Sequence, residues 1–154
     1  MKKIGYGLLI LSLVLCFAGC QKQSENISGS LSDIMKEVYK NIPEDELPEL
    51  INEKVNKDNQ EYYLGSSDIT YKEALASEPL MSSVAHSVVL VRANSVKDVD
   101  NIKKEIKEKI DPRKWVCVGV DEKNVLVESK GDLVILIMDN KYAATIRDNF
   151  LNLK

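Results

Sequence analysis

The run "LVILIM", residues 133–138, restricts the fold of this 154-residue chain more than any other feature. Successive side chains of a strand point to opposite faces, so a strand with one wet face alternates apolar and polar residues. Six consecutive apolar residues show no such alternation, and both faces of this strand must therefore be covered. We expect helices from the N-terminal part of the chain to cover the second face. If they do not, a partner protein must cover it.

Three other segments are typical of strands. "SVVLVRA", residues 87–93, is β-branched and apolar, while "WVCVGV" (115–120) and "NVLVES" (124–129) precede the central run. The short polar links "DEK" and "KGD" between them predict tight turns. The C-terminal half therefore predicts a meander of antiparallel strands.

Helices are expected on both sides of these strands. Ser95 and Asp98 cap the clearest helix, Asp111-Pro112 ends it, and one stripe carries its apolar residues Val96, Val99, Ile102, Ile106 and Ile110. Asp139 or Asn140 caps a last helix, whose apolar residues are Tyr142, Ile146, Phe150 and Leu153.

The N-terminal half predicts two amphipathic helices. The first starts at Ser30 or Ser32 and ends at Pro43, with Leu31, Ile34, Met35, Val38 and Ile42 on one face. The second follows in "PEDELPELINEKV", residues 43–55, and would bury Leu47, Leu50, Ile51 and Val55. Residues 57–65 are then expected to be extended, and the capping-box pattern of Thr70 and Glu73 predicts a short helix to Ser77.

Together these elements predict an α+β fold. We expect a mostly antiparallel three- to four-stranded sheet packed against helices, with two extra N-terminal helices, as a single domain over residues 30–154.

The first twenty residues have the organisation of a signal peptide. Lys2 and Lys3 form a positive segment, residues 4–17 are apolar, and Ala18-Gly19 is a small-residue cleavage site followed at once by Cys20. "FAGC" resembles the bacterial lipobox, although Phe17 stands where leucine is commonest. The resemblance implies a lipoprotein signal at 1–19, a diacylglyceryl group on Cys20, and a flexible tether over 20–29.

An uncleaved transmembrane helix is the alternative reading of this segment. The 16 residues from Ile4 to Gly19 would rise about 24 Å, which is short of a hydrocarbon core of about 30 Å. Two acyl chains, such as palmitate, anchor a protein stably where one chain is marginal. We therefore expect a protein held on the extracytoplasmic face of the cell membrane.

Charge and cysteine content exclude several classes of function. Removing residues 1–19 takes away Lys2 and Lys3 but no acid, so 21 basic residues become 19 against 24 acidic ones. This acidic balance, without a basic patch, argues against a nucleic-acid partner. After lipidation of Cys20 only Cys117 remains, so the mature chain has no internal disulfide and no thiolate metal site, and we expect no cofactor.

A family resemblance extends over about residues 30–152. The segments "YYLG", "KDVDNIKKEI" and "KGDLVILIMD" resemble a family of small lipoproteins from low-GC Gram-positive bacteria, catalogued as a domain of unknown function of the DUF 4358 type. The shared motifs are structural, so the resemblance implies location and fold but no catalytic residues. Residues 111–124 are shorter than is usual in that family.

Few residues are candidates for chemistry. His86, the only histidine, and Cys117 could form a thiol–imidazole pair, but Cys117 in "WVCVGV" is explained more simply as a small packing residue. An imidazole at a strand start is ordinarily exposed or capping. The acids Glu44, Asp45, Glu46 and Glu49 lack the spacing of a calcium loop and suit a solvated helix start.

Tyr62, Tyr63 and Tyr71 are the most interesting aromatic group. Tyrosines near a turn can stack on a sugar or fill a partner's pocket, and core packing is the alternative. The sequence thus favours a non-enzymatic envelope module that binds another envelope protein or a small ligand, through a sheet face or these tyrosines. The alternative is an envelope enzyme that uses Cys117, His86 or surface acids.

Overall fold

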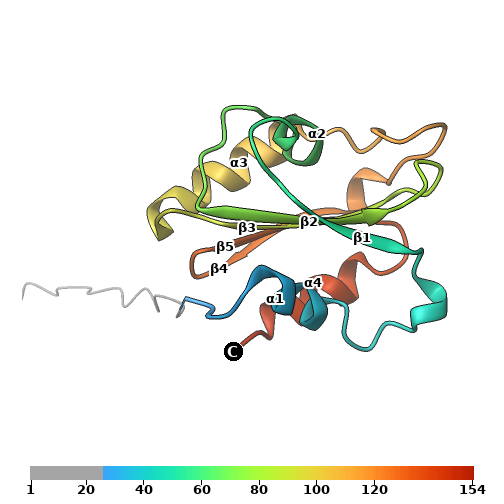
Figure 1. The fold of residues 1–154 in the computed structure, drawn as a ribbon, viewed down its shortest axis with the longest axis horizontal. Helices are drawn as coiled ribbons and strands as arrows, with labels where there is room; N and C mark the ends of the chain where they lie inside the picture. The colour runs from blue at the N-terminus through green and yellow to red at the C-terminus, as the bar shows by residue number, and fades with distance from the viewer. Residues whose placement is uncertain (1–25) are drawn as a thin grey trace, which may run out of the picture.

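The computed structural model describes residues 26–154, which form a five-stranded antiparallel sheet with helices on both faces (Figure 1). The strand order is β1-β2-β3-β5-β4, and the strands are β1 (Leu50–Lys54), β2 (Glu73–Pro79), β3 (His86–Arg92), β4 (Val125–Lys130) and β5 (Leu133–Asp139). The helices are α1 (Leu31–Val38), α2 (Gln60–Leu64), α3 (Val99–Lys109) and α4 (Ala143–Leu151). Single 3-10 turns lie at η1 (Glu44–Glu46), η2 (Val96–Asp98) and η3 (Glu122–Asn124).

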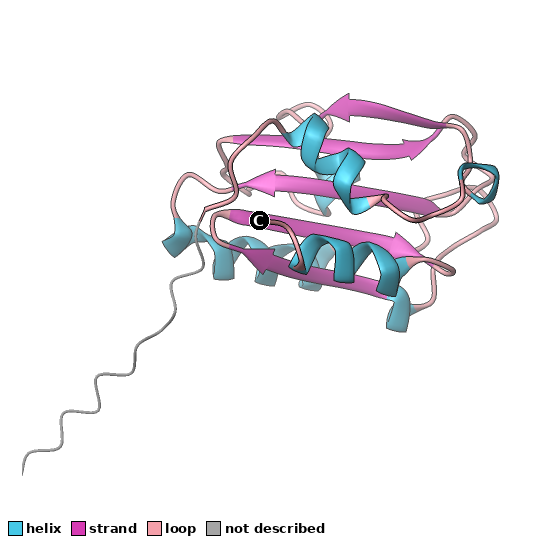
Figure 2. Cartoon of the chain, turned by 90° about the horizontal axis from the view of Figure 1, so that it is seen from below, coloured by secondary structure: helices cyan, strands magenta, loops and turns pink. Residues whose placement is uncertain are grey.

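Strand β5 is buried along its whole length between β3 and β4. Its alternate side chains enter two separate hydrophobic cores: Val134, Leu136 and Met138 pack on the α3 side, and Leu133, Ile135 and Ile137 pack with α1 and α4. Figure 2 shows α1 and α4 together on one face of the sheet. The prediction that N-terminal residues cover the second face of this strand is confirmed by α1.

The sequence located the central elements correctly. The predicted strands at 87–93, 124–129 and 133–138 are β3, β4 and β5, and the helix after Ser95 is η2 followed by α3. Ser30 caps α1, because its hydroxyl oxygen accepts a hydrogen bond from the Asp33 N–H at 3.2 Å. The α+β class is confirmed, but the sheet has five strands rather than three or four.

The predicted second helix, over residues 43–55, is wrong. Only η1 is helical there, and Leu50–Lys54 form β1, which pairs with β2. Pro48 explains the interruption, since proline lacks an N–H and disfavours helical geometry in the residue before it. Leu47 is indeed extended, with a ψ of 145°. The first predicted helix also ends early, at Val38.

In the next two segments, the structure has a helix where an extended segment was expected and a strand where a helix was expected. Residues 57–65, expected to be extended, contain α2, and the helix expected from Thr70 to Ser77 is β2. Gly65 ends α2 with a left-handed φ of 78°. A Cβ there would lie 2.5 Å from the Lys109 carbonyl oxygen, so only glycine lets the end of α2 sit against the end of α3.

The strand predicted for "WVCVGV" is absent from the described fold. Residues 110–121 form a loop in which Trp115 and Val120 are buried, while Val116 and Cys117 are exposed. Cys117 has a φ of 61°, which interrupts an extended chain. The backbone N–H groups of Val116 and Val120 donate to the loop carbonyls of Ser82 and Pro112 rather than to a strand.

Ordered structure begins before residue 30. Ile27 is buried in the core beneath α1 and α4, and Arg92 donates hydrogen bonds to the carbonyl oxygens of Ile27 at 2.7 Å and Gly29 at 2.9 Å. The same guanidinium pairs with Glu73 at 2.8 Å and Asp132 at 3.4 Å. Residues 27–29 of the expected tether are therefore held against the sheet, whereas Cys20 and the signal segment lie outside the described residues.

Replacement of Arg92 tests this attachment. Arg92→Ala leaves two carbonyl oxygens without their donor, and we expect it to lower the free energy of unfolding by roughly 2–4 kcal/mol. Arg147→Ala is the matched control, because the partner of Arg147 is its exposed neighbour Asp148, and its effect should stay within about 0.5 kcal/mol. Urea unfolding of both variants measures the difference, and equal losses would contradict the assigned role.

Candidate functional site

Two of the three predicted tyrosines lie together on α2, over the β1–β2 edge of the sheet. The Tyr62 hydroxyl donates to Glu78 of β2 at 3.0 Å, and the Tyr63 hydroxyl donates to Glu53 of β1 at 2.8 Å. The two rings meet edge to face, with centroids 5.0 Å apart. Tyr63 is buried, whereas Tyr62 remains nearly half exposed. Tyr62 is therefore the tyrosine of this pair that a partner can reach.

Lys114, from loop 110–121, reaches between these aromatic rings. Its ammonium nitrogen lies 4.2 Å from the Tyr62 ring centroid, 5.2 Å from that of Tyr63 and 5.3 Å from that of Trp115. It also forms an ion pair with Glu78. We call Tyr62, Tyr63, Glu78, Lys114 and Trp115 the lysine–aromatic cluster.

The ion pair in this cluster is almost enclosed. The side chains of Lys114 and Glu78 are 6% and 9% exposed. Burial lowers the pKa of Lys114, against the opposing effect of the Glu78 charge. Burial and the Glu78 carboxylate together raise the pKa of Tyr62 to about 12. Because the ammonium is already paired and surrounded by rings, the cluster fastens the loop to β2 rather than presenting Lys114 as a nucleophile.

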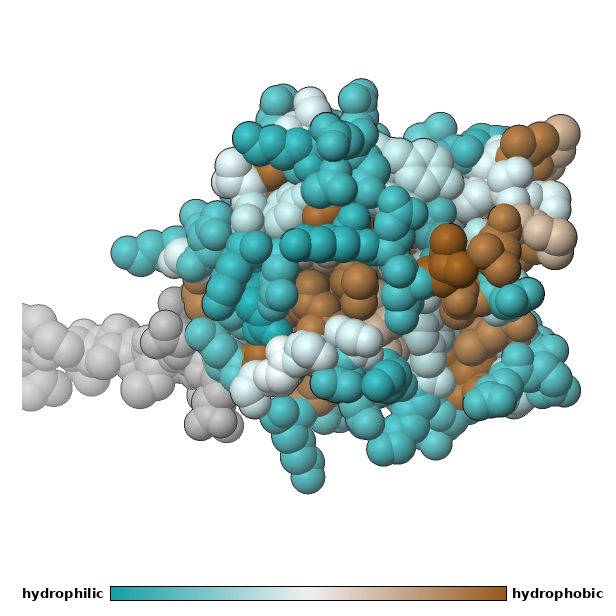
Figure 3. Space-filling model, viewed as in Figure 1, coloured by the Kyte–Doolittle hydropathy of each residue, from teal (hydrophilic) through white to brown (hydrophobic). Residues whose placement is uncertain are grey.

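An exposed apolar patch lies beside the cluster. Its members are 42–65% exposed, and we define the end patch as Ile51, Tyr62, Leu80, Met81 and Val116. Backbone hydrogen bonds bring the segments that carry these residues together. The Leu80 N–H donates to the Glu49 carbonyl, next to β1, and the Val116 N–H donates to the Ser82 carbonyl, next to Met81. Figure 3 shows hydrophobic side chains at the right-hand end of the molecule, where these loops lie in Figure 1. Such a grouping is a common mark of an interaction surface.

Tyr71 does not join the other two tyrosines. It packs against the core on the α3 side and lines a hollow of about 280 Å³ that neither Tyr62 nor Tyr63 lines. Burial raises the pKa of its hydroxyl. For Tyr71, core packing is the better description.

The structure does not unite His86 with Cys117. His86 is buried rather than exposed, and its ring nitrogens contact the Tyr39 hydroxyl at 2.8 Å and the Asp139 carboxylate at 2.7 Å. Both nitrogens are thus occupied, on the face that carries α1. Cys117 is exposed in its loop and is not the buried packing residue that the sequence suggested. No imidazole nitrogen is left to activate the Cys117 thiol.

The Tyr39–His86–Asp139 chain joins the end of α1 to two strands. Burial alone would raise the pKa of Asp139, but hydrogen bonds from His86 and from the Tyr142 and Lys141 N–H groups outweigh it and lower that pKa. The bonds from the Tyr142 and Lys141 N–H groups hold the turn before α4. The predicted cap at Asp139 or Asn140 is nevertheless wrong, because Tyr142 is the N-cap of α4 and no side chain caps this helix. Burial raises the pKa of Tyr39 strongly, which leaves its hydroxyl protonated at neutral pH.

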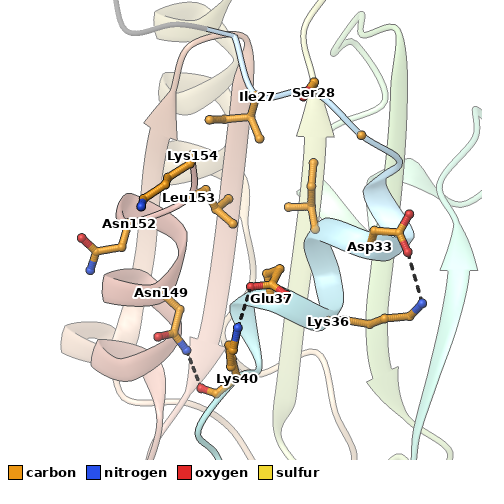
Figure 4. Close-up of a pocket in the computed structure, with 12 residues that line it drawn as sticks. Ile27, Ser28, Asp33, Lys36, Glu37, Lys40, Asn149, Asn152, Leu153 and Lys154 are labelled. Carbon is orange, nitrogen blue, oxygen red and sulfur yellow. Dashed lines mark hydrogen bonds and ion pairs between the residues drawn. The ribbon is translucent and has the colours of Figure 1, made fainter.

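A groove of about 570 Å³ separates α1 from α4 (Figure 4). Four of its five charged side chains pair along α1, with Lys36 3.2 Å from Asp33 and Lys40 3.3 Å from Glu37, and Lys154 is the fifth. Asn149 donates to the Val38 and Lys40 carbonyls across it. The groove therefore offers no concentrated charge to a ligand.

The remaining predicted features give no site in the described part of the chain. Glu44, Asp45 and Glu46 lie in the exposed turn η1, and Glu49 is exposed next to β1. No group of histidine, cysteine or acidic side chains within residues 26–154 could hold a metal ion. Over the same residues no helix is long and apolar enough to cross a membrane.

Sequence reasoning missed Lys114 and Glu78, which organise the cluster. They are 36 residues apart, and nothing in either local pattern distinguishes them from exposed charges. The return of loop 110–121 to the turn after β2, where the Val116 N–H donates to the Ser82 carbonyl, brings them together. The "KW" pair at 114–115, a charge next to the single tryptophan, was the one available hint.

The ion pair in the lysine–aromatic cluster can be tested by removing one of its charges and by replacing both charged residues with apolar ones. Lys114→Gln leaves Glu78 buried without its counter-charge, and we expect a loss of roughly 3–5 kcal/mol in unfolding free energy. Lys114→Met with Glu78→Leu should recover most of that loss. Lys141→Gln, which breaks the exposed pair with Glu46, is the control and should cost under about 1 kcal/mol. A double variant as unstable as Lys114→Gln would contradict a buried ion pair.

Comparisons of the chain with known protein families, with curated proteins and with solved structures find no match. The resemblance to lipoproteins of the DUF 4358 type stays a prediction from the sequence.

Proposed function

We propose that this protein is a non-enzymatic binding module of the cell envelope, anchored to the extracytoplasmic face of the membrane by a diacylglyceryl group on Cys20. The end patch is the observation that carries the binding role. Ile51, Leu80, Met81 and Val116 are apolar and exposed, and the adjoining Tyr62 offers both a ring and a hydroxyl. Exposed aromatic and apolar side chains in one place are typical of the centre of a protein interface.

Several contacts fix the loop that carries part of the end patch, which suits recognition. Lys114 and Trp115 fix the loop that carries Val116, and the Val116 N–H fixes that loop to the turn after β2. A surface that is already ordered loses little conformational entropy when a partner binds. The sheet faces are poorer candidates, because α1 and α4 cover one of them and α3 covers the other.

The position of the end patch also suits a membrane-anchored protein. The described chain begins at the left-hand end of Figure 1, and the turn after β2 and loop 110–121, which carry most of the end patch, lie at the right-hand end. The seven residues from Cys20 to Asn26 span at most about 25 Å when fully extended. The proposed anchor therefore keeps the left-hand end near the lipid surface and leaves the end patch facing away from it, toward other envelope proteins.

The envelope-enzyme alternative has less support. It depended on Cys117 within reach of His86 or an acid, and His86 is engaged on the other face by Tyr39 and Asp139.

Intact mass tests the anchor. Protein isolated from membranes of a low-GC Gram-positive host should have a mature mass that starts at Cys20 with an added diacylglyceryl group. The Cys20→Ala variant should lack the lipid and leave the membrane fraction. An unmodified full-length mass in the membrane would contradict the proposed anchor.

Photo-crosslinking in intact cells tests the binding role. A photoreactive amino acid at Met81, which is 65% exposed in the end patch, should give a discrete crosslinked product with one envelope protein. Leu151 on α4 is the matched control, because it is also apolar and exposed but lies outside the end patch. The product at Met81 should disappear with Leu80→Ser. Identical products at both positions, or none at Met81, would overturn the proposal.

A further inference from the structure

Strand β1 is an open edge of the sheet. It is the first strand in the order β1-β2-β3-β5-β4, and four of its five residues are exposed. The Val55 N–H donates to the Ala74 carbonyl, and the Leu80 N–H donates to the Glu49 carbonyl. In an antiparallel pair, every second residue of a strand turns its N–H and carbonyl toward the neighbouring strand, so the odd-numbered residues of this segment are the ones bonded to β2. The backbone groups of Leu50, Asn52 and Lys54 therefore point away from the sheet.

These outward groups are largely unused within residues 26–154. The Lys54 carbonyl accepts from the Asn59 side chain at 3.2 Å, which confirms its direction. Neither the N–H nor the carbonyl of Asn52 has a described partner. An edge with free donors and acceptors can pair with another extended chain.

The side chains beside this edge form a defined pattern. Glu49, Ile51 and Glu53 alternate along the face of the segment that carries α2, because Ile51 lies opposite Glu78 and Glu53 lies opposite Ala76. Ile51 therefore adjoins Tyr62, whose hydroxyl binds the same Glu78. The edge presents acid, apolar and acid positions in turn.

The segment around β1 is strongly acidic. Residues 44–61 contain seven acidic and two basic side chains, while the whole chain has a net charge of only −3. Glu53 is hydrogen-bonded by Tyr63 and Asn59, which are neutral and leave its charge uncompensated. A second copy of this acidic edge would be repelled, whereas a basic segment would be attracted.

We propose that β1 accepts an extended segment of an envelope protein as an added strand, and that this segment has basic, apolar and basic side chains at alternate positions. The apolar residue would pack on Ile51 and Tyr62, and the basic residues would face Glu49 and Glu53. Because the pattern is symmetric, it holds for a parallel or an antiparallel strand. The inference rests on the proposed function and names the chemistry of its partner.

A defined peptide tests the added strand. The probe is an acetylated, amidated Ser-Lys-Thr-Val-Thr-Lys-Ser peptide, compared with the same peptide carrying Glu in place of Lys. Titrated into the isotope-labelled mature domain, the lysine peptide should shift and protect the Asn52 amide more than any other amide of β1. The glutamate peptide should have no effect.

Asn52→Pro removes the outward N–H but spares the bonds between β1 and β2, since edge strands tolerate proline at such positions. It should weaken peptide binding by at least about tenfold. Asn52→Thr keeps the N–H and should bind like the original. The added strand would be overturned if both peptides bound equally or if Asn52→Pro bound the lysine peptide as well as the original protein does. It would also be overturned if the free protein formed a dimer that Asn52→Pro abolished, because a second copy would then occupy the edge. In that case, a crosslink at Met81 that persists in Asn52→Pro would still support the proposed function, because it would show that the end patch binds a partner without an added strand.

Discussion

Strand β5 must be covered on both faces, and the remaining architecture follows from that requirement. Seven buried residues in a row cannot meet water on either side, and each fully buried aliphatic side chain contributes roughly 1.5–3 kcal/mol. Covering one face uses α3, and covering the other uses α1 and α4. The chain therefore commits both its N-terminal and its C-terminal helix to the same face, which leaves the edge strands as the least covered part of the sheet.

Two buried cations complete the architecture where regular structure ends. Arg92 ties the segment before α1 to the sheet through two backbone carbonyls, and Lys114 ties loop 110–121 to β2 through Glu78. Each cation orders a segment that has no strand or helix of its own. The second attachment has a functional consequence, because it places Val116 next to Leu80 and Met81 and so builds the end patch. The same region contains the open edge of β1, so both proposed contacts with a partner belong to one continuous surface.

The sequence predicted the central elements well and the edge poorly, for a physical reason. The apolar residues of β3, α3 and β5 are what drive these elements into the core. Their burial can therefore be recognised in the sequence itself. The segment 43–55 had an apolar period that fits a helix, and Pro48 was the signal that contradicted it. Thr70 and Glu73 matched a capping box, but pairing with β1 and β3 outweighed that local preference. Propensity is a weak guide where long-range pairing decides the outcome.

The sequence by itself determined the α+β class, the buried central strand and the helix after Ser95. These depend on the composition and period of short segments. Only the tertiary structure decided that Tyr62 and Tyr63 enclose Lys114, that His86 is buried with Tyr39 and Asp139, and that Cys117 faces solvent. Each of these depends on residues far apart in the chain meeting across the sheet, and no local pattern records which distant side chain will become a neighbour.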